Sequence, residues 1–149
     1  MKKLILTLLL TVLSVTAAQA QDRMAIQPFF NDGIPHAPDA KVTAVSVTGN
    51  QLKSHGNLSI YRSVSVTGDS ELIRKIERAV TRGGTKAESR EVSLKDGRLY
   101  FGFYTMPPLG NENRYIFYLN STLAGGSKAT LIYLQGEASS AEIQRLIKR

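Results

Sequence analysis

Cysteine is absent from the 149 residues of this chain, and histidine occurs only at His36 and His55. Without cysteine there can be no disulfide, no thiolate metal site, no cysteine nucleophile and no lipid-modified cysteine of a bacterial lipoprotein. The sequence also lacks the phosphate-loop and dinucleotide fingerprints and the Gly-x-Ser-x-Gly element of serine hydrolases. We therefore expect a non-catalytic protein with no cofactor, no nucleotide and no bound metal. The alternative is a small hydrolase that uses either histidine with a nearby serine and aspartate.

The N-terminal segment has the organisation of a secretory signal peptide. Lys2 and Lys3 precede an apolar run at 4–15, and residues 18–20, Ala-Gln-Ala, provide the small side chains of a cleavage site. The apolar run is shorter than the roughly 20 residues of a transmembrane helix. We expect cleavage after Ala20, location in the periplasm or outside the cell, and no transmembrane anchor in the mature chain. An uncleaved N-terminal anchor is the alternative.

Positive charge exceeds negative charge moderately, with a net charge of +7 for the whole chain. The basic residues are spread along the sequence, whereas a nucleic-acid-binding protein concentrates them in clusters. The densest group is Arg74, Lys75, Arg78 and Arg82. Its position on a predicted helix indicates a solvated face that complements the helix dipole. The alternative is an anion-binding surface for lipid head groups or nucleic acid.

Residues 21–41 are rich in proline and precede the predicted domain. They contain three of the five prolines, and proline fixes φ and removes a backbone donor, which excludes a regular helix or central strand. The segment also carries the apolar pair Phe29 and Phe30. We expect an N-terminal arm whose aromatic pair packs on the domain, with a docking peptide for another protein as the alternative. Residues 42–149 then form a single α+β domain.

The pentapeptide Val-Ser-Val-Thr-Gly occurs twice, at 45–49 and at 64–68. Alternation of Val with Ser or Thr predicts a half-buried strand, and the Asn50 or Asp69 that follows is a residue type that caps helices. The first copy predicts a strand-turn-helix unit at 42–56 with only a short helical turn. The two copies allow either a hairpin or a parallel crossover between their strands.

The second copy leads into the best helix of the sequence, at about 69–82. Five apolar residues recur there at helical spacing, namely Leu72, Ile73, Ile76, Ala79 and Val80. We expect Asp69 to cap the start of the helix and the pair Gly83-Gly84 to stop it.

The remaining sequence predicts a four-stranded antiparallel meander and a closing helix. Asp96-Gly97 between strands at 91–95 and 98–105 predicts a tight hairpin, and Pro107-Pro108 is expected to end the second strand. Further strands are predicted at 114–120 and 129–135. The helix follows at about 140–148, after the capping-box spacing of Ser139 and Glu142. The predicted fold class is thus α+β, a largely antiparallel sheet with two helices packed on it.

The aromatic strand at 98–105 provides the candidate binding surface. Strict alternation places Leu99, Phe101 and Phe103 on one face and Arg98, Tyr100 and Tyr104 on the other. Tyr115 or Tyr118 of the next strand can join the latter. Tyrosine beside arginine can stack on sugars or bases or anchor a protein. We interpret Arg98, Tyr100, Tyr104 and Tyr118 as a surface that binds a protein, glycan or envelope component, with burial beneath a helix or the arm as the alternative.

The repeated pentapeptide, the Asp69 helix, the aromatic hairpin and the closing segment from Thr130 to Ile147 share one layout. In that layout the chain resembles the small exported proteins of unknown function of Bacteroides-like Gram-negative bacteria. The resemblance covers most of the mature chain and concerns fold, not catalysis. It implies a periplasmic or secreted setting, and it transfers no activity and no functional residue.

Overall fold

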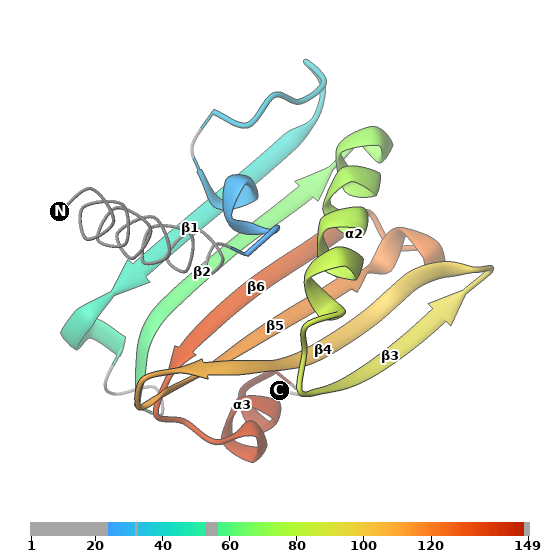
Figure 1. Cartoon of the computed structure of the whole chain (residues 1–149). Helices are drawn as coiled ribbons and strands as arrows, with labels where there is room; N and C mark the ends of the chain where they lie inside the picture. Colours follow the sequence, from blue (N-terminus) through green and yellow to red (C-terminus); the bar gives the residue numbers. More distant parts are fainter. Residues whose placement is uncertain (1–23, 32, 53–56, 148–149) are drawn as a thin grey trace, which may run out of the picture.

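The structure is a computed structural model that describes residues 24–31, 33–52 and 57–147. Six strands form one sheet in the order β1-β2-β6-β5-β4-β3, and every neighbouring pair is antiparallel. The strands are β1 (Lys41–Thr48), β2 (Leu58–Thr67), β3 (Ser89–Lys95), β4 (Arg98–Leu109), β5 (Glu112–Asn120) and β6 (Lys128–Gly136). Two helices, α2 (Ser70–Gly84) and α3 (Ser140–Ile147), pack on the sheet (Figure 1). The predicted α+β class is confirmed. No helix within these described ranges is long and apolar enough to cross a membrane.

Strands β1 and β2 form a hairpin, which resolves the choice left open by the repeated pentapeptide. Thr48 pairs with Ile60 near the turn, and Lys41 pairs with Thr67 at the other end. After β1 the chain makes the 3-10 turn η2 (Gly49–Leu52). Within the described ranges this turn is the helical part of the unit predicted at 42–56, and the last residues of the unit, 53–56, lie outside those ranges.

Helix α2 connects β2 to β3, which lies at the opposite edge of the sheet. Strands β3, β4, β5 and β6 then follow one another as neighbours, and β6 returns to pair with β2. Ser65 of the second pentapeptide lies opposite Thr130 in this last pairing. The β1–β2 hairpin and the C-terminal strands thus form one sheet, although α2 separates them in sequence.

The first turn of α2 is fixed by Asp69, as predicted. The Asp69 side chain accepts hydrogen bonds from the backbone N–H of Leu72 at 2.9 Å and of Ala37 at 2.8 Å. These bonds satisfy one of the free donors of the helix start and tie the N-terminal arm to it. They also hold the pKa of Asp69 below the ordinary value of an aspartate, the Leu72 bond being the main cause.

The larger core cluster lies between α2 and one face of the sheet. The predicted apolar stripe of α2 is buried there against Val64, Val66, Ile116 and Leu131. The 3-10 turn η1 (Gln27–Phe30) of the N-terminal arm covers the neighbouring part of the same face, and Phe30 is buried in the cluster (Figure 1). The expectation that the aromatic pair packs on the domain is confirmed for Phe30, and Phe29 packs against the same cluster half-buried.

The pair Gly83-Gly84 does not stop α2, contrary to the prediction. The helix includes both glycines, and Thr85 is its C-cap. Gly84 lies against the ring of Tyr104, and a Cβ added at Gly84 would come within 2.9 Å of Tyr104 Cδ1. The glycine is therefore needed because the helix approaches the sheet closely here, and its sequence position alone suggested a stop.

A bulge in β4 overturns the predicted alternation. Ser93 pairs with Phe101 but Leu94 pairs with Leu99, so Tyr100 is an extra residue on β4. Leu99 consequently packs in the α2 cluster with Tyr104, while Phe103 lies in the other cluster. The prediction that Leu99 shares a face with Phe101 and Phe103 is wrong. The strand also continues through Pro107-Pro108 to Leu109, with a register shift after Met106.

The second core cluster lies on the opposite face, beneath α3. Its buried residues are Leu52, Leu58, Phe103, Tyr115, Phe117, Leu134, Ala138 and Ile143. Ser139 accepts a hydrogen bond from the Glu142 N–H at 3.3 Å, which is the predicted cap of α3. Tyr115 donates its hydroxyl to the Ala138 carbonyl oxygen at 2.8 Å and so ties the start of the helix to β5.

Substitution of Gly84 by alanine tests the close approach of α2 to the sheet. The new methyl group would overlap the ring of Tyr104, which is 3% exposed and cannot move away. We expect the free energy of unfolding to fall by about 1–3 kcal/mol in urea denaturation. The matched control is Gly83→Ala, where nothing lies within 4 Å of the added Cβ. Alanine favours helices, so this control should gain up to about 1 kcal/mol. Equal effects of the two changes would contradict the contact.

Replacement of Asp69 by asparagine tests the charged cap. The lowered pKa of Asp69 means that its ionised form stabilises the fold at neutral pH and that this contribution is lost as the pH falls through the lowered value. The asparagine side chain of the variant does not titrate. We expect D69N to be less stable than wild type at about pH 7 and the difference to shrink below about pH 4. Urea unfolding at several pH values measures this, and a difference that is independent of pH would contradict it.

Candidate functional site

The tyrosines that the sequence assigned to a binding surface lie mainly beneath α2. Tyr104 is 3% exposed and Tyr118 is fully buried, both in the cluster that α2 covers. Burial raises the pKa of each phenol, so both hydroxyls stay protonated at neutral pH. Tyr100 is half-buried at the bulge, with Lys95 Nζ 5.3 Å from its ring centroid. These three tyrosines do not form one open surface.

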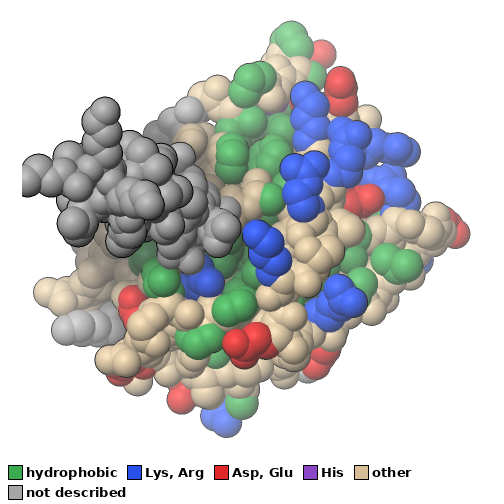
Figure 2. Space-filling view, viewed as in Figure 1, with side chains coloured by type: hydrophobic (Ala, Val, Ile, Leu, Met, Phe, Trp, Pro, Cys, Tyr) green, Lys and Arg blue, Asp and Glu red, His purple; other side chains and the backbone are tan. Residues whose placement is uncertain are grey.

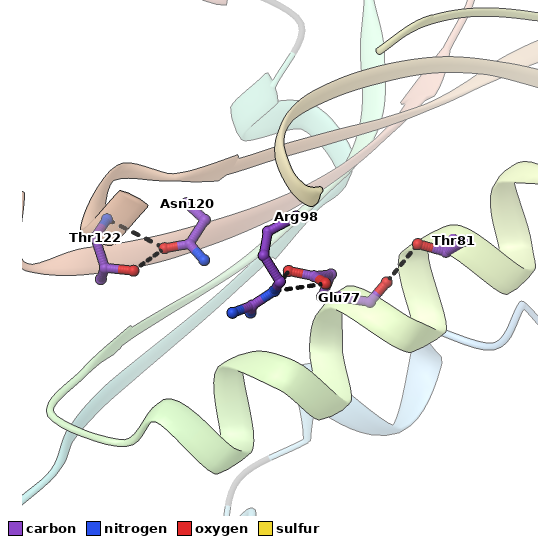
Figure 3. A network of polar contacts seen from close by, with 5 residues as sticks. All are labelled: Glu77, Thr81, Arg98, Asn120 and Thr122. Carbon is purple, nitrogen blue, oxygen red and sulfur yellow. Dashed lines mark hydrogen bonds and ion pairs between the residues drawn. The ribbon is translucent and has the colours of Figure 1, made fainter. Parts of the chain in front are cut away.

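Arg98, the fourth residue of that predicted surface, extends to α2. Its Nε lies 3.1 Å from each carboxylate oxygen of Glu77, and its Nη2 lies 2.9 Å from Oε1 (Figure 3). The hydrogen bond with the Glu77 carboxylate raises the pKa of Arg98. This two-point contact fixes the plane of the guanidinium group between the helix and the sheet.

A partly exposed surface of aromatic and aliphatic side chains lies instead on the opposite face of the sheet, beside α3. Phe101 and Phe117 meet edge to face there, with ring centroids 5.6 Å apart. Tyr61, Leu119 and Ile132 are half-buried on the same face. We call the hollow beside them the α3 groove; its volume is about 560 Å³, and its lining consists of Leu52, Leu58, Tyr61, Phe117, Leu119, Thr130, Ile132, Leu134, Leu146 and Ile147.

The α3 groove exists because α3 is short. A helix of eight residues is about 12 Å long, whereas a sheet of six strands is about 24 Å wide. Ile143 is fully buried under the helix, but Leu146 near its end is 39% exposed at the groove. Tyr61 and Thr130 contribute hydroxyl groups, and no side chain described in the lining is charged. The groove therefore suits an apolar ligand.

The basic residues of α2 form the other candidate surface. Arg74, Lys75, Arg78 and Arg82 are all exposed at the surface of the helix, and Figure 2 shows Lys and Arg side chains gathered over this helix. Arg74 differs from the other three because it lines a hollow of about 430 Å³. We call it the Arg98 hollow; its lining consists of Gly68, Asp69, Ser70, Ile73, Arg74, Arg98, Asn120 and Thr122.

Asn120 forms the buried wall of the Arg98 hollow. Its side chain is 1% exposed, and its Oδ1 accepts hydrogen bonds from the backbone N–H of Thr122 at 3.1 Å and from the Thr122 hydroxyl (Figure 3). Within the described ranges, neither Asn120 Nδ2 nor the Tyr118 hydroxyl has a hydrogen-bond partner. The hollow thus brings together Arg74, Arg98 and the Asn120 amide, whose Nδ2 donates no hydrogen bond in the described ranges. The sequence analysis had placed Arg74 and Arg98 in two different candidate sites.

The sequence analysis did not identify Asn120 in the Arg98 hollow, nor the apolar residues that line the α3 groove. Asn120-Ser121-Thr122 does carry a signal, because an asparagine at a strand end commonly accepts from the N–H two residues later. Phe117, Leu119 and Ile132 alternate with core residues of the other face, and strands that are apolar on both faces need a covering layer on each. The shortness of the closing helix was the available sign that one face stays partly open.

The histidines give no catalytic arrangement in the part of the chain that the structure describes. His36 is exposed, and its Nδ1 lies 2.7 Å from the Ile34 carbonyl oxygen. His55 lies outside the described ranges. Among residues 24–31, 33–52 and 57–147, no three side chains of His, Cys, Asp or Glu are grouped so that they could hold a metal ion.

Comparison with known proteins gives a family but no activity. No curated protein matches the chain, and no solved structure matches it. Residues 13–147 match a family of unknown function, DUF6108. The match includes all six strands and both helices and confirms the resemblance to an uncharacterised family. The chain therefore belongs to this family of unknown function.

Proposed function

We propose that the chain is an exported, non-catalytic domain that binds the acyl chain of an envelope lipid in the α3 groove. The observation that carries the proposal is an open hollow of about 560 Å³ whose lining is almost entirely hydrocarbon. Its size lies within the range of small-molecule sites. This proposal keeps the sheet face as the binding surface but moves it from the buried tyrosines to the side beside α3.

The lining of the α3 groove favours an acyl chain over a glycan as its ligand. A glycan needs several hydrogen-bond partners, and the groove provides only the hydroxyls of Tyr61 and Thr130. An acyl chain needs no hydrogen-bond partner, and its binding is stabilised by about 25 cal/mol for each Å² of apolar surface that leaves water. Leu119 and Ile132 are half-buried in the groove, so a bound chain would remove apolar surface on both sides of the contact.

Leu146 lies where a ligand could enter the α3 groove. Its side chain is 39% exposed on the last turn of α3 and lines the groove. Ile143, one turn earlier, is fully buried and attaches the helix to the sheet. A ligand at the groove would therefore contact the end of α3 without displacing the residue that holds the helix in place.

Export is the second part of the proposal, and the sequence supports it. Lys2, Lys3, the apolar run at 4–15 and the small residues at 18–20 match a secretory signal peptide. Removal of this segment would place the mature chain in the periplasm or outside a Gram-negative, Bacteroides-like cell. That compartment contains the lipids on which the binding proposal depends.

A ligand-displacement experiment tests the groove. We expect the mature chain to bind an environment-sensitive apolar fluorophore and palmitate to displace it. Leu146→Glu places a charge at the entrance that bound hydrocarbon would desolvate, and we expect about tenfold weaker binding, since each 1.4 kcal/mol is tenfold. The matched control is Leu109→Glu, the same change at a side chain 45% exposed in β4 and outside the lining; it should bind like wild type.

Thermal unfolding of both variants checks that α3 still packs, and both should unfold like wild type because the replaced side chains are already accessible. Equal binding by the two variants, or no displacement by palmitate, would contradict the lipid proposal. Displacement by a hydrophobic peptide but not by palmitate would replace the lipid with a protein partner.

Processing in a Gram-negative host tests export separately. We expect mass spectrometry of the product to give a chain that begins at Gln21. Ala18→Phe and Ala20→Phe should each leave the precursor uncleaved, because both positions require small residues. Gln19→Phe, at the tolerant position between them, should be cleaved normally. A product of wild type that retains residues 1–20 would contradict this prediction.

A further inference from the structure

The Arg98 hollow has donors without acceptors, and Asn120 is the clearest of them. The Asn120 amide cannot be reversed, because its Oδ1 accepts from the backbone N–H of Thr122 at 3.1 Å. Its Nδ2 therefore faces away from Thr122 and toward α2 (Figure 3). Nδ2 has no hydrogen-bond partner within standard geometry in the described ranges, although the side chain is 1% exposed, and its buried neighbour, the Tyr118 hydroxyl, also lacks one. A buried amide donor of this kind is costly unless an acceptor reaches it.

Arg98 contributes a second donor to the same space. Glu77 engages its Nε and Nη2, which leaves Nη1 outside the pair. Figure 3 shows the end of the Arg98 guanidinium directed away from Glu77, on the side of Asn120. Both residues line the hollow, and the contact with Glu77 holds the guanidinium in place before any ligand arrives.

One carboxylate lines the hollow, and it already accepts hydrogen bonds from backbone N–H groups. It belongs to Asp69, and its two oxygens accept from the N–H groups of Leu72 and Ala37. Arg74 adds a positive charge at the exposed rim. The hollow thus offers Asn120 Nδ2, the Arg98 Nη1 that Glu77 leaves free and the Arg74 guanidinium to a ligand that brings oxygen acceptors, and its lining carries two guanidinium groups against the one carboxylate of Asp69.

We propose that the Arg98 hollow binds a small oxyanion, a carboxylate or a phosphate group, with Asn120 Nδ2, Arg98 Nη1 and Arg74 as its donors. Guanidinium and amide donors form short, strong hydrogen bonds with such groups. The basic residues along α2 raise the local concentration of anions. The site lies on the face that α2 covers, and it is independent of the α3 groove on the other face.

Titration of the mature chain with inorganic phosphate and with succinate tests the site, by calorimetry and by the side-chain amide NMR signals. Asn120→Asp keeps the acceptor for Thr122 and replaces the donor with a negative charge, so we expect binding to weaken by about tenfold or more. Arg74→Gln removes an exposed charge and should weaken binding by about three- to tenfold. The matched control is Arg78→Gln, which removes an equal charge one turn along α2, outside the lining.

The pattern of losses decides the proposal. Loss in N120D and R74Q with less than about twofold change in R78Q supports the site, since a remote surface charge contributes little. The stronger of the two probes identifies phosphate or carboxylate. Equal losses in R74Q and R78Q would show only diffuse attraction to the helix, and absence of binding by both probes at millimolar concentration would also overturn the site. R74Q decides the outcome even if N120D fails to fold.

Discussion

The structure depends on one constraint: the sheet is apolar on both faces, and the two helices of the described ranges that cover these faces differ in length. Helix α2, with 15 residues, is about 22 Å long and spans most of the sheet. The N-terminal arm completes that layer through Ile26 and Phe30. Helix α3 has eight residues and leaves part of the second face open. The tightly covered face therefore supplies most of the core, and the partly covered face supplies the groove.

Local signals in the sequence predicted the elements well, and nonlocal contacts decided the rest. Asp69, the apolar stripe of α2 and the Asp96-Gly97 turn each act within a few residues, and the structure confirms them. The role of Gly84 depends on Tyr104, and these two residues meet only in the folded sheet. From sequence alone, a glycine pair before a strand therefore predicts the end of a helix, because the contact of Gly84 with Tyr104 is known only from the structure.

The candidate site was harder to predict for the same reason. One extra residue at Tyr100 reverses the alternation of β4, so the faces inferred for Leu99 and Phe101 could not both be right. Arg74 and Arg98 were identified as separate basic residues, and only the return of β4 past α2 brings them to one hollow. The prediction of export rests on the local pattern of residues 1–20, and the structure describes the chain from Met24 onward.

Strand β5 belongs to both sites. Phe117 and Leu119 line the α3 groove, whereas Asn120 lines the Arg98 hollow on the other face. Alternate residues of a strand exchange faces when one residue is inserted or deleted. A single insertion within 117–120 would therefore turn part of what β5 contributes to these linings to the wrong face of the sheet. Length changes in this family should be tolerated in the turns around β5 and excluded from the strand itself, whereas substitutions can alter either site alone.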